Sequence, residues 1–310
     1  MTVRSQTDGF VLVNALILVA AMAAAAILLL SRAEGGQTRL VAMQQAEMLI
    51  GGLDTYEALA RAVLDRDLLA GGLDGPGDIW AEPITDAPLA HGSVSGQITD
   101  QQALFNINWL ADPEDTFALE SGRRLFQRIG LSPQKADAII AYVSPVGPGN
   151  RATYAALRPP VSPLGGSLLM LDQLAALPEL QPRDFALLRQ HTTALPGRSP
   201  VNVNTADAGL LSAVLPQLSA ARIDAALMRR RSERFPSTEA FFRDLGLLVD
   251  PQVPGAVDIS RFSVGSNWFR ADIVARLDDR EARRQVLLRR EGTVRGTQVE
   301  WRVSRFEPVP

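Results

Sequence analysis

The chain has 310 residues, a net charge of −3 and no cysteine. Its length allows about two domains with a sizeable core. Its nearly balanced charge lacks the basic excess typical of nucleic acid binding proteins. The absence of cysteine excludes a disulfide framework, a thiol nucleophile and a Cys-ligated zinc site. His91 and His191 are the only histidines, so a histidine-rich metal centre is also excluded.

An apolar run fills residues 10–30, and Asn14 is its only polar residue. A helix of this length spans about 30 Å, the thickness of a bilayer core. Three interpretations remain open: a permanent membrane anchor, a secretory signal cut after Ala33, or a leader cut between Gly9 and Phe10 that leaves the apolar helix in the mature chain. The run exceeds the roughly 7 to 15 apolar residues of a usual secretory signal, which disfavours the second interpretation.

The apolar pattern continues beyond the membrane-length run. Apolar residues recur at mostly three- and four-residue steps: Ala46, Met48, Leu49, Leu53, Tyr56, Leu59, Val63 and Leu64. This spacing predicts one amphipathic helix that continues to about Leu69. Glycines 35–36 and 51–52 each cost a helix about 1 kcal/mol relative to alanine, so a bend or break is expected there.

Residues from about 111 to 250 are predicted to be mainly helical, after a strand near 94–99. One helix ends at Gly130, and Ser132-Pro133 is a typical start for the next. Short helices are expected at 171–177 and 182–191, and three more are expected to begin at Thr205, Ser219 and Ser237.

The C-terminal region returns to strand patterns. Alternating runs at 262–264, 268–277, 284–290 and 299–306 predict an antiparallel meander. Its many arginines are most simply explained by a solvated sheet face. The fold class predicted from these elements is α+β.

The short polar leader that ends in Gly9, followed by Phe10 and an apolar helix, resembles the type III signal of the type IV pilin superfamily. Over essentially the whole chain, the sequence resembles one branch of it, the K-type minor pseudopilins of type II secretion (general secretion pathway protein K family). The landmarks of that family occur in order: Asp100 followed by Leu104–Asn108, Leu171–Leu174, Ala194–Pro196 before Val201–Ala206, and Phe262–Ser266 before Trp268 and Phe269. The two Asn-x-Asn elements among them are the most specific feature.

The resemblance implies a domain order. It comprises a leader (1–9), a transmembrane helix (10–30), a helix extension (31–72), the first part of a pilin-like α/β core (73–110), a large inserted all-α domain (111–257) and a closing antiparallel sheet (258–310). It further implies a non-enzymatic subunit that nucleates or caps the tip of the pseudopilus during protein export across the outer membrane. The expected location is the inner membrane, crossed once, with the C-terminal domain in the periplasm.

The resemblance also implies partners and processing. Prepilin peptidase would cut between Gly9 and Phe10, and Phe10 would then be N-methylated. Minor pseudopilins of the I and J types are the expected partners, and the insert is a candidate contact for secretion substrate or the outer-membrane channel.

Asn14 would be the fifth residue of the mature chain, where pilin-like subunits usually carry glutamate. In that superfamily the glutamate is thought to neutralise the N-terminal amine of a neighbouring subunit inside the membrane, where an unpaired charge is costly. K-type members characteristically lack it, which makes Asn14 a candidate assembly residue. The alternative is that Asn14 is a polar residue merely tolerated in an anchor.

The asparagines at 106, 108, 202 and 204 are predicted to be structural. Asparagines at alternating positions place both amides on one face of a strand or turn, where they can satisfy backbone groups at a domain junction. They are not catalytic candidates.

Structural calcium is suggested by the family resemblance alone. Calcium takes six to eight oxygen ligands, and family members tend to carry an Asp-rich segment after the first helical hairpin of the insert. The corresponding segment here, Tyr142–Asn150, contains no acid. Asp250, Asp258, Asp278 and Asp279 are other candidates but are also ordinary turn and surface acids, so no metal ligands are assigned.

A periplasmic helix-hairpin-helix DNA-binding protein is the alternative function. Residues 201–206, the two helices that follow, and Arg222, Arg229–Arg231 and Arg234 suit such a module. However, its turn at Pro216–Ser219 lacks the glycines that let backbone N–H groups approach phosphate. An enzyme is less well supported, because no nucleophile elbow, phosphate loop or paired-acid motif accompanies either histidine.

Overall fold

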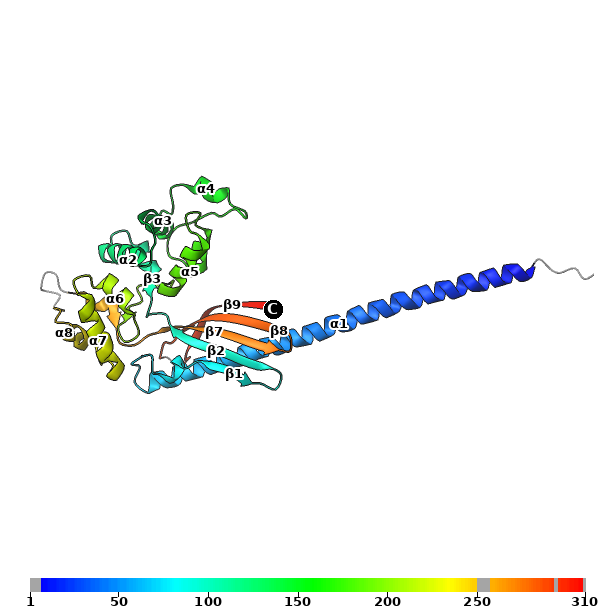
Figure 1. Cartoon of the computed structure of the whole chain (residues 1–310), viewed down its shortest axis with the longest axis horizontal. Helices are drawn as coiled ribbons and strands as arrows, with labels where there is room; N and C mark the ends of the chain where they lie inside the picture. Colours follow the sequence, from blue (N-terminus) through cyan, green and yellow to red (C-terminus); the bar gives the residue numbers. More distant parts are fainter. Residues whose placement is uncertain (1–6, 250–256, 293–294, 309–310) are drawn as a thin grey trace, which may run out of the picture.

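In the computed structural model, residues 7–249, 257–292 and 295–308 are described. Helix α1 (Thr7–Leu69) is a single 63-residue helix, and its N-terminal half projects far from the rest of the molecule (Figure 1). The helix ends at Leu69 as predicted, but neither glycine pair breaks it. Its N-terminal part is apolar and long enough to cross a membrane, with a mean hydropathy of 2.6, and none of that part is buried.

The C-terminal half of α1 packs on a five-stranded antiparallel sheet through a buried stripe comprising Leu49, Leu53, Tyr56, Ala60 and Leu64. The strands lie in the order β1 (Ile84–Pro88), β2 (Ser93–Asp100), β7 (Trp268–Leu277), β8 (Arg280–Arg289) and β9 (Gln298–Pro308). Strands β2 and β7 are neighbours in the sheet although the insert separates them in the sequence. The chain thus leaves the core after β2 and re-enters it at β7.

Small residues let α1 lie close to the sheet. Gly96 of β2 lies under the ring of Tyr56, and a Cβ atom there would stand 2.4 Å from Tyr56 Cζ. Ala271, Ala275 and Ala282 also face the helix. Because period-2 alternation places every second strand residue on this face, the stripe on α1 meets a mostly apolar surface. Arg284 of β8 also lies on it and pairs with Glu57 of α1 at 3.0 Å.

The meander β7–β8–β9 was predicted from the sequence, and strand β1 was not. The expected strand at 262–264 was placed wrongly. Phe262–Ser263 (β6) does not join the meander but pairs in parallel with Val201–Asn202 (β5) inside the insert. A similar short parallel pair joins β3 (Phe105–Asn106) to β4 (Thr192–Thr193).

The insert has its own core, built around buried aromatic rings that include Phe105, Phe126, Tyr154, Phe241 and Phe242. Its α-helices are α2 (Thr116–Arg128), α3 (Pro133–Val143), α4 (Arg151–Ala155), α5 (Pro182–His191), α6 (Ala208–Val214), α7 (Ala220–Ser232) and α8 (Thr238–Asp244). The 3₁₀ helices of the chain are η1 (Ile79–Ala81), η2 (Ile107–Ala111), η3 (Leu171–Ala176) and η4 (Ile259–Arg261). The insert lies at the end of the molecule away from the projecting half of α1 (Figure 1).

The helix starts follow the predicted capping chemistry with one correction. Ser132 accepts a hydrogen bond from Lys135 N, and Ser237 accepts one from Ala240 N. Ser219 stands at the start of α7 without a side-chain cap bond. Thr205 does not begin α6. Asp207 does, and Thr205 turns inward to a buried carboxylate.

Candidate functional site: an exposed helix and a buried core–insert junction

The residues predicted for processing and assembly lie in the first turns of α1. Gly9 and Phe10 have helical backbone, and Asn14 is exposed one turn further on. The rise from Phe10 to Asn14 is about 6 Å, so the structure keeps the three positions together at the tip of the projecting helix. Their roles in processing and assembly remain predictions.

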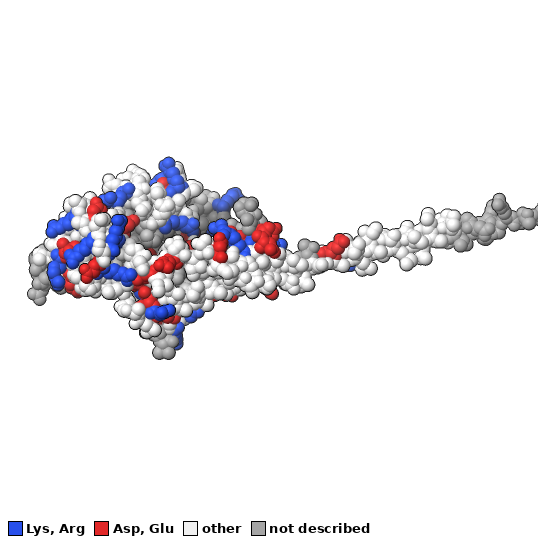
Figure 2. Space-filling view, turned by 60° about the horizontal axis from the view of Figure 1, so that its bottom comes forward, with Lys and Arg blue, Asp and Glu red and all other residues white. Residues whose placement is uncertain are grey.

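Beyond the membrane-length segment, α1 keeps apolar side chains in solvent. We define this exposed helix surface by Leu40, Val41, Met43, Met48, Ile50 and Leu59, which are between 37% and 63% exposed. The projecting part of α1 carries few charged groups, whereas charges crowd the globular end (Figure 2). Exposed apolar side chains mark interaction sites, so α1 offers apolar side chains for helix packing both inside and beyond the span of a bilayer.

The first Asn-x-Asn element binds main-chain groups within the insert. Asn106 Oδ1 accepts from the backbone N–H groups of Asn108 and Leu195, both at 3.1 Å, and its Nδ2 donates to Leu195 O at 3.2 Å. Asn108 donates to Leu168 O at 2.9 Å and accepts from Leu168 N at 2.7 Å. Both side chains are buried and hold the segments around 168 and 195 against η2.

The second element repeats this geometry at the border of the core. Asn202 Oδ1 accepts from Asn204 N at 2.9 Å, and Asn204 both donates to Phe235 O and accepts from Phe235 N at 3.0 Å. Asn202 Nδ2 instead donates to Asp100 Oδ2 at 3.1 Å and to Ser266 Oγ at 2.9 Å. These contacts agree with the predicted structural role of all four asparagines, but only the second element lies at the junction between core and insert.

Asp100 ends β2 and is the centre of this border. Its Oδ2 also accepts from Thr205 Oγ1 at 2.5 Å and Ser266 Oγ at 2.6 Å, and its Oδ1 accepts from Gln102 N at 2.8 Å. Burial raises the pKa of this carboxyl, against the lowering effect of the hydrogen bonds. One carboxylate therefore joins the end of β2 to both ends of the second half of the insert.

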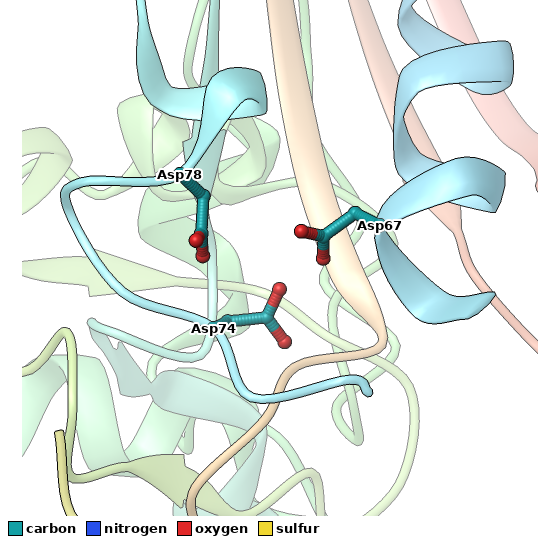
Figure 3. A group of neighbouring side chains, drawn as sticks. All are labelled: Asp67, Asp74 and Asp78. Atoms are coloured by element: carbon teal, nitrogen blue, oxygen red, sulfur yellow. The ribbon is translucent and has the colours of Figure 1, made fainter. Parts of the chain in front are cut away.

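Three more acids converge next to this point, where α1 ends and the chain turns into η1 (Figure 3). Asp67, Asp74 and Asp78 each place one oxygen within 4.8 Å of the others. Arg290, only 1% exposed, lies against them and donates to Asp67 Oδ2 at 2.7 Å and to Asp74 Oδ2 at 2.5 Å. Arg234 of the insert pairs with Asp78.

Asp74 is the most buried member of this acidic cluster, with no exposed surface. Its Oδ2 also accepts from Ser266 N at 2.6 Å, while its buried Oδ1 has no hydrogen-bond partner among the described residues. Burial raises the pKa of Asp74 to about 7, although Arg290 opposes the shift. This cluster was not predicted from the sequence. The only signal is the pair of acids, Asp74 and Asp78, that flank Gly75-Pro76-Gly77.

The calcium candidates are not brought together by the structure. Asp258 caps η4 and pairs with Arg261, whereas Asp278 and Asp279 form the β7–β8 turn. Asp250 lies outside the described residues. The acidic cluster does not fit calcium either, because guanidinium or backbone N–H groups engage four of its six carboxylate oxygens, leaving Asp67 Oδ1 and Asp74 Oδ1. Arg290 supplies the positive charge that a cation would bring there.

Three of the five arginines of the DNA-binding alternative, Arg229, Arg230 and Arg234, bond to other groups of the protein. Arg230 donates to Val203 O and Ala206 O, Arg234 donates to Leu73 O, and Arg229 pairs with Asp244. Burial lowers the pKa of Arg230 to about 10. Arg229 and Arg230 tie α7 to its neighbours, and Arg234 ties the segment after α7 to the end of the α1 region, so these three arginines have partners within the chain.

Comparison with known proteins agrees with the family resemblance of the sequence. Residues 103–197 and 201–259 match two family models, both described as type II secretion system (T2SS), protein K. The division between them falls just before the second Asn-x-Asn element. The two matches cover the insert, the region with the most specific sequence landmarks.

Whole-length relatives agree. The chain is 27% identical to the type II secretion system protein K of Pseudomonas aeruginosa, covering 92% of this chain and 88% of the relative. It is 26% identical to that of Pectobacterium carotovorum, with 93% and 94% covered. The fold also matches a chain in the crystal structure of the GspK-GspI-GspJ complex from enterotoxigenic Escherichia coli. The TM-score is 0.70 at 20% identity, over 86% of this chain and 99% of that one.

The long apolar helix, the antiparallel sheet and the large helical insert form a fold that this chain shares with a chain of the GspK-GspI-GspJ complex. By the two family models and the whole-length relatives, the chain belongs to the type II secretion system protein K family.

Proposed function

We propose that this chain is a structural, non-enzymatic subunit at the tip of the type II secretion pseudopilus, where it nucleates or caps the filament during export across the outer membrane. In this proposal the first part of α1 crosses the inner membrane once, and the globular end stands in the periplasm. The apolar, fully exposed N-terminal half of α1 supports the anchor.

The observation that carries the tip position is the place of the insert. It covers the end of the sheet opposite the projecting half of α1 (Figure 1). Subunits of a helical filament stack along the direction of their long helices, so a body of this size at the far end leaves little room for another subunit above it. A terminal subunit needs helix contacts on one side only, and the exposed helix surface supplies them.

The partners in this proposal are minor pseudopilins of the I and J types. A solved structure that shares this fold is a complex of GspK with GspI and GspJ, and a similar complex would use the exposed helix surface of α1. Prepilin peptidase would release the mature chain before Phe10, and Asn14 suits a subunit that adds to no neighbour above it.

Labelled filaments test the tip position. The chain has no cysteine, so a Leu164→Cys variant places one label on a residue of the insert that is 87% exposed. We expect gold conjugated to this cysteine at one end of each pseudopilus in electron micrographs. Gold spaced along the shaft would contradict the proposal, and the unlabelled wild-type chain controls for nonspecific gold.

A further inference from the structure

A cleft separates the insert from the sheet face that points away from α1. Its volume is about 170 Å³, with Arg189 of α5 on one side, Arg283 of β8 and Arg305 of β9 on the other, and Val274 and Val303 between them. A smaller pocket of about 40 Å³ continues it and shares Arg189 and Gln285. Arg270 and Trp301 also line this continuation.

The arginines of this cleft are arranged unfavourably for the isolated chain. Arg283 and Arg305 are direct cross-strand partners in the β8–β9 register, and like charges in that arrangement destabilise a sheet. Arg283 pairs with Glu281 at 2.5 Å, but Glu281 also serves Arg276. Arg305 is exposed and makes no ion pair or side-chain hydrogen bond with any residue that the structure describes.

The acids nearby do not neutralise the cleft. Asp272 is held by Arg270 at 2.9 Å and by Gln285 at 2.7 Å. Asp172 is held by Arg189 at 2.8 Å. Four guanidinium groups, those of Arg189, Arg270, Arg283 and Arg305, thus meet three carboxylates, those of Asp172, Asp272 and Glu281, in a chain whose net charge is −3. This local positive excess is complementary to carboxylates brought by another chain.

Strand β9 adds a backbone component. It is the last strand of the described sheet, 11 residues long, and is paired on one side only, with β8. An extended segment can add to such an edge through main-chain hydrogen bonds, and alternate side chains then lie on one face. Trp301, Val303 and Arg305 of β9 point to the cleft side of the sheet.

We propose that this cleft binds an extended acidic segment of another protein, which adds to β9 as a strand and places a carboxylate on the cleft side against Arg305 and its cross-strand neighbour Arg283. The inference concerns a different surface from the exposed helix surface. It holds whether or not the chain stands at a filament tip.

The test uses the full chain in detergent micelles and a fluorescent, acetylated octapeptide of alternating Glu and Thr, followed by fluorescence anisotropy. The matched peptide of alternating Gln and Thr is expected to bind at least about 10-fold more weakly, because it cannot form charge-assisted pairs. Arg305→Gln should weaken the Glu peptide by about 10-fold, and Arg283→Gln with Arg305→Gln by more. Arg128→Gln on α2 removes an exposed arginine elsewhere and should leave binding unchanged.

Folding is controlled separately. Arg305 makes no ion pair or side-chain hydrogen bond within the described part of the chain, so its variant should keep the wild-type melting temperature. Equal binding of the Glu and Gln peptides, or full binding by the double variant, would overturn the proposal. Inorganic phosphate that binds with the same arginine dependence while the Glu peptide does not would also overturn it in favour of a small-anion site. A Glu peptide N-methylated at alternate residues should lose binding, and its retention would rule out strand addition.

Discussion

The two Asn-x-Asn elements have the same local geometry in different electrostatic surroundings. In each, the side-chain oxygen of the first asparagine accepts a hydrogen bond from the backbone N–H of the second. The side chain of the second donates to the backbone oxygen and accepts from the backbone N–H of one distant residue, Leu168 or Phe235. The first element meets only neutral main-chain groups, whereas Asn202 meets the buried carboxylate of Asp100.

This difference separates two tasks. Asn106 and Asn108 close the first half of the insert on itself. Asn202 reaches Asp100 at the end of β2 and Ser266 before β7, so it fixes the insert to both strands from which it departs. The acidic cluster and Arg290 lie against the same Ser266. Charge is therefore concentrated where the insert joins the core.

The largest expected effect comes from removing the cation of this charged junction. Arg290→Ala leaves Asp67 and Asp74 without their buried partner and should lower the free energy of unfolding by about 3 to 5 kcal/mol. Urea unfolding of the full chain in micelles, followed by tryptophan fluorescence, measures it. The neighbouring Arg289→Ala is the matched control, because Arg289 is 41% exposed and its pairs with Glu291 and Glu300 lie at the surface. A loss of unfolding free energy below about 1 kcal/mol for Arg290→Ala would contradict the stabilising role of Arg290 at this junction.

A second prediction uses the pKa of Asp74, which burial raises to about 7. A raised carboxyl pKa means that the folded state binds more protons than the unfolded state between about pH 4 and 7, so stability falls as pH rises through this window. From pH 5.5 to 7.5 the loss should be about 2 kcal/mol. Asp74 is faced by Arg290, Asp67, Asp78, Arg234 and, further off, Asp100.

Unfolding free energies at several pH values, for wild type and Asp74→Asn, measure this slope. The variant should flatten it, and Asp279→Asn in the β7–β8 turn should not. An Asp74→Asn variant with the full wild-type slope would assign the titration to another group.

The sequence predicts the elements whose pattern is local. Strands β7, β8 and β9 follow period-2 alternation, and Ser132-Pro133 marks the start of α3. Strand β1 was missed because an irregular register and a positive φ of 48° at Asp86 interrupt its short run. No pattern in the sequence around Arg290 predicts that its side chain is buried. Arginine-rich alternation predicts a wet face, and only partners more than 200 residues away, Asp67 and Asp74, explain the burial of Arg290.

The same limit applies to the site residues. The Asn-x-Asn elements were found because the motif repeats within the chain, but their partners Leu168, Leu195 and Phe235 follow from tertiary structure alone. Thr205 was predicted as the cap of α6, but Asp207, two residues later, offers the same capping chemistry and is the cap in the structure. Local capping rules cannot decide between two such neighbours when a buried carboxylate attracts one of them.

A third prediction compares the two elements directly. Asn106→Ala and Asn202→Ala both remove the cap on the second asparagine, and each should cost about 1 to 3 kcal/mol. Asn202→Ala should cost about 1 kcal/mol more, because it also removes a donor from the buried Asp100. It should also speed proteolysis at the joins between core and insert, while Asn106→Ala speeds it near residues 168 and 195. Mass spectrometry of the first fragments separates these outcomes. The same first cuts in both variants would show that the elements are equivalent.

The smallest expected effect on the fold, and the sharpest on maturation, is that of Gly9→Ala. This position is far from the globular end, so the melting temperature should not change. If prepilin peptidase cuts between Gly9 and Phe10, the added methyl group should block the cut and leave the full-length chain in the membrane. Intact mass and N-terminal sequencing, with and without the peptidase, distinguish a chain that starts at methylated Phe10 from an uncut one. Ser5→Ala in the same leader is the control and should be processed normally. A chain that starts near Glu34 in every strain would instead indicate ordinary secretion, and α1 would then lose the membrane segment on which the proposed tip position depends.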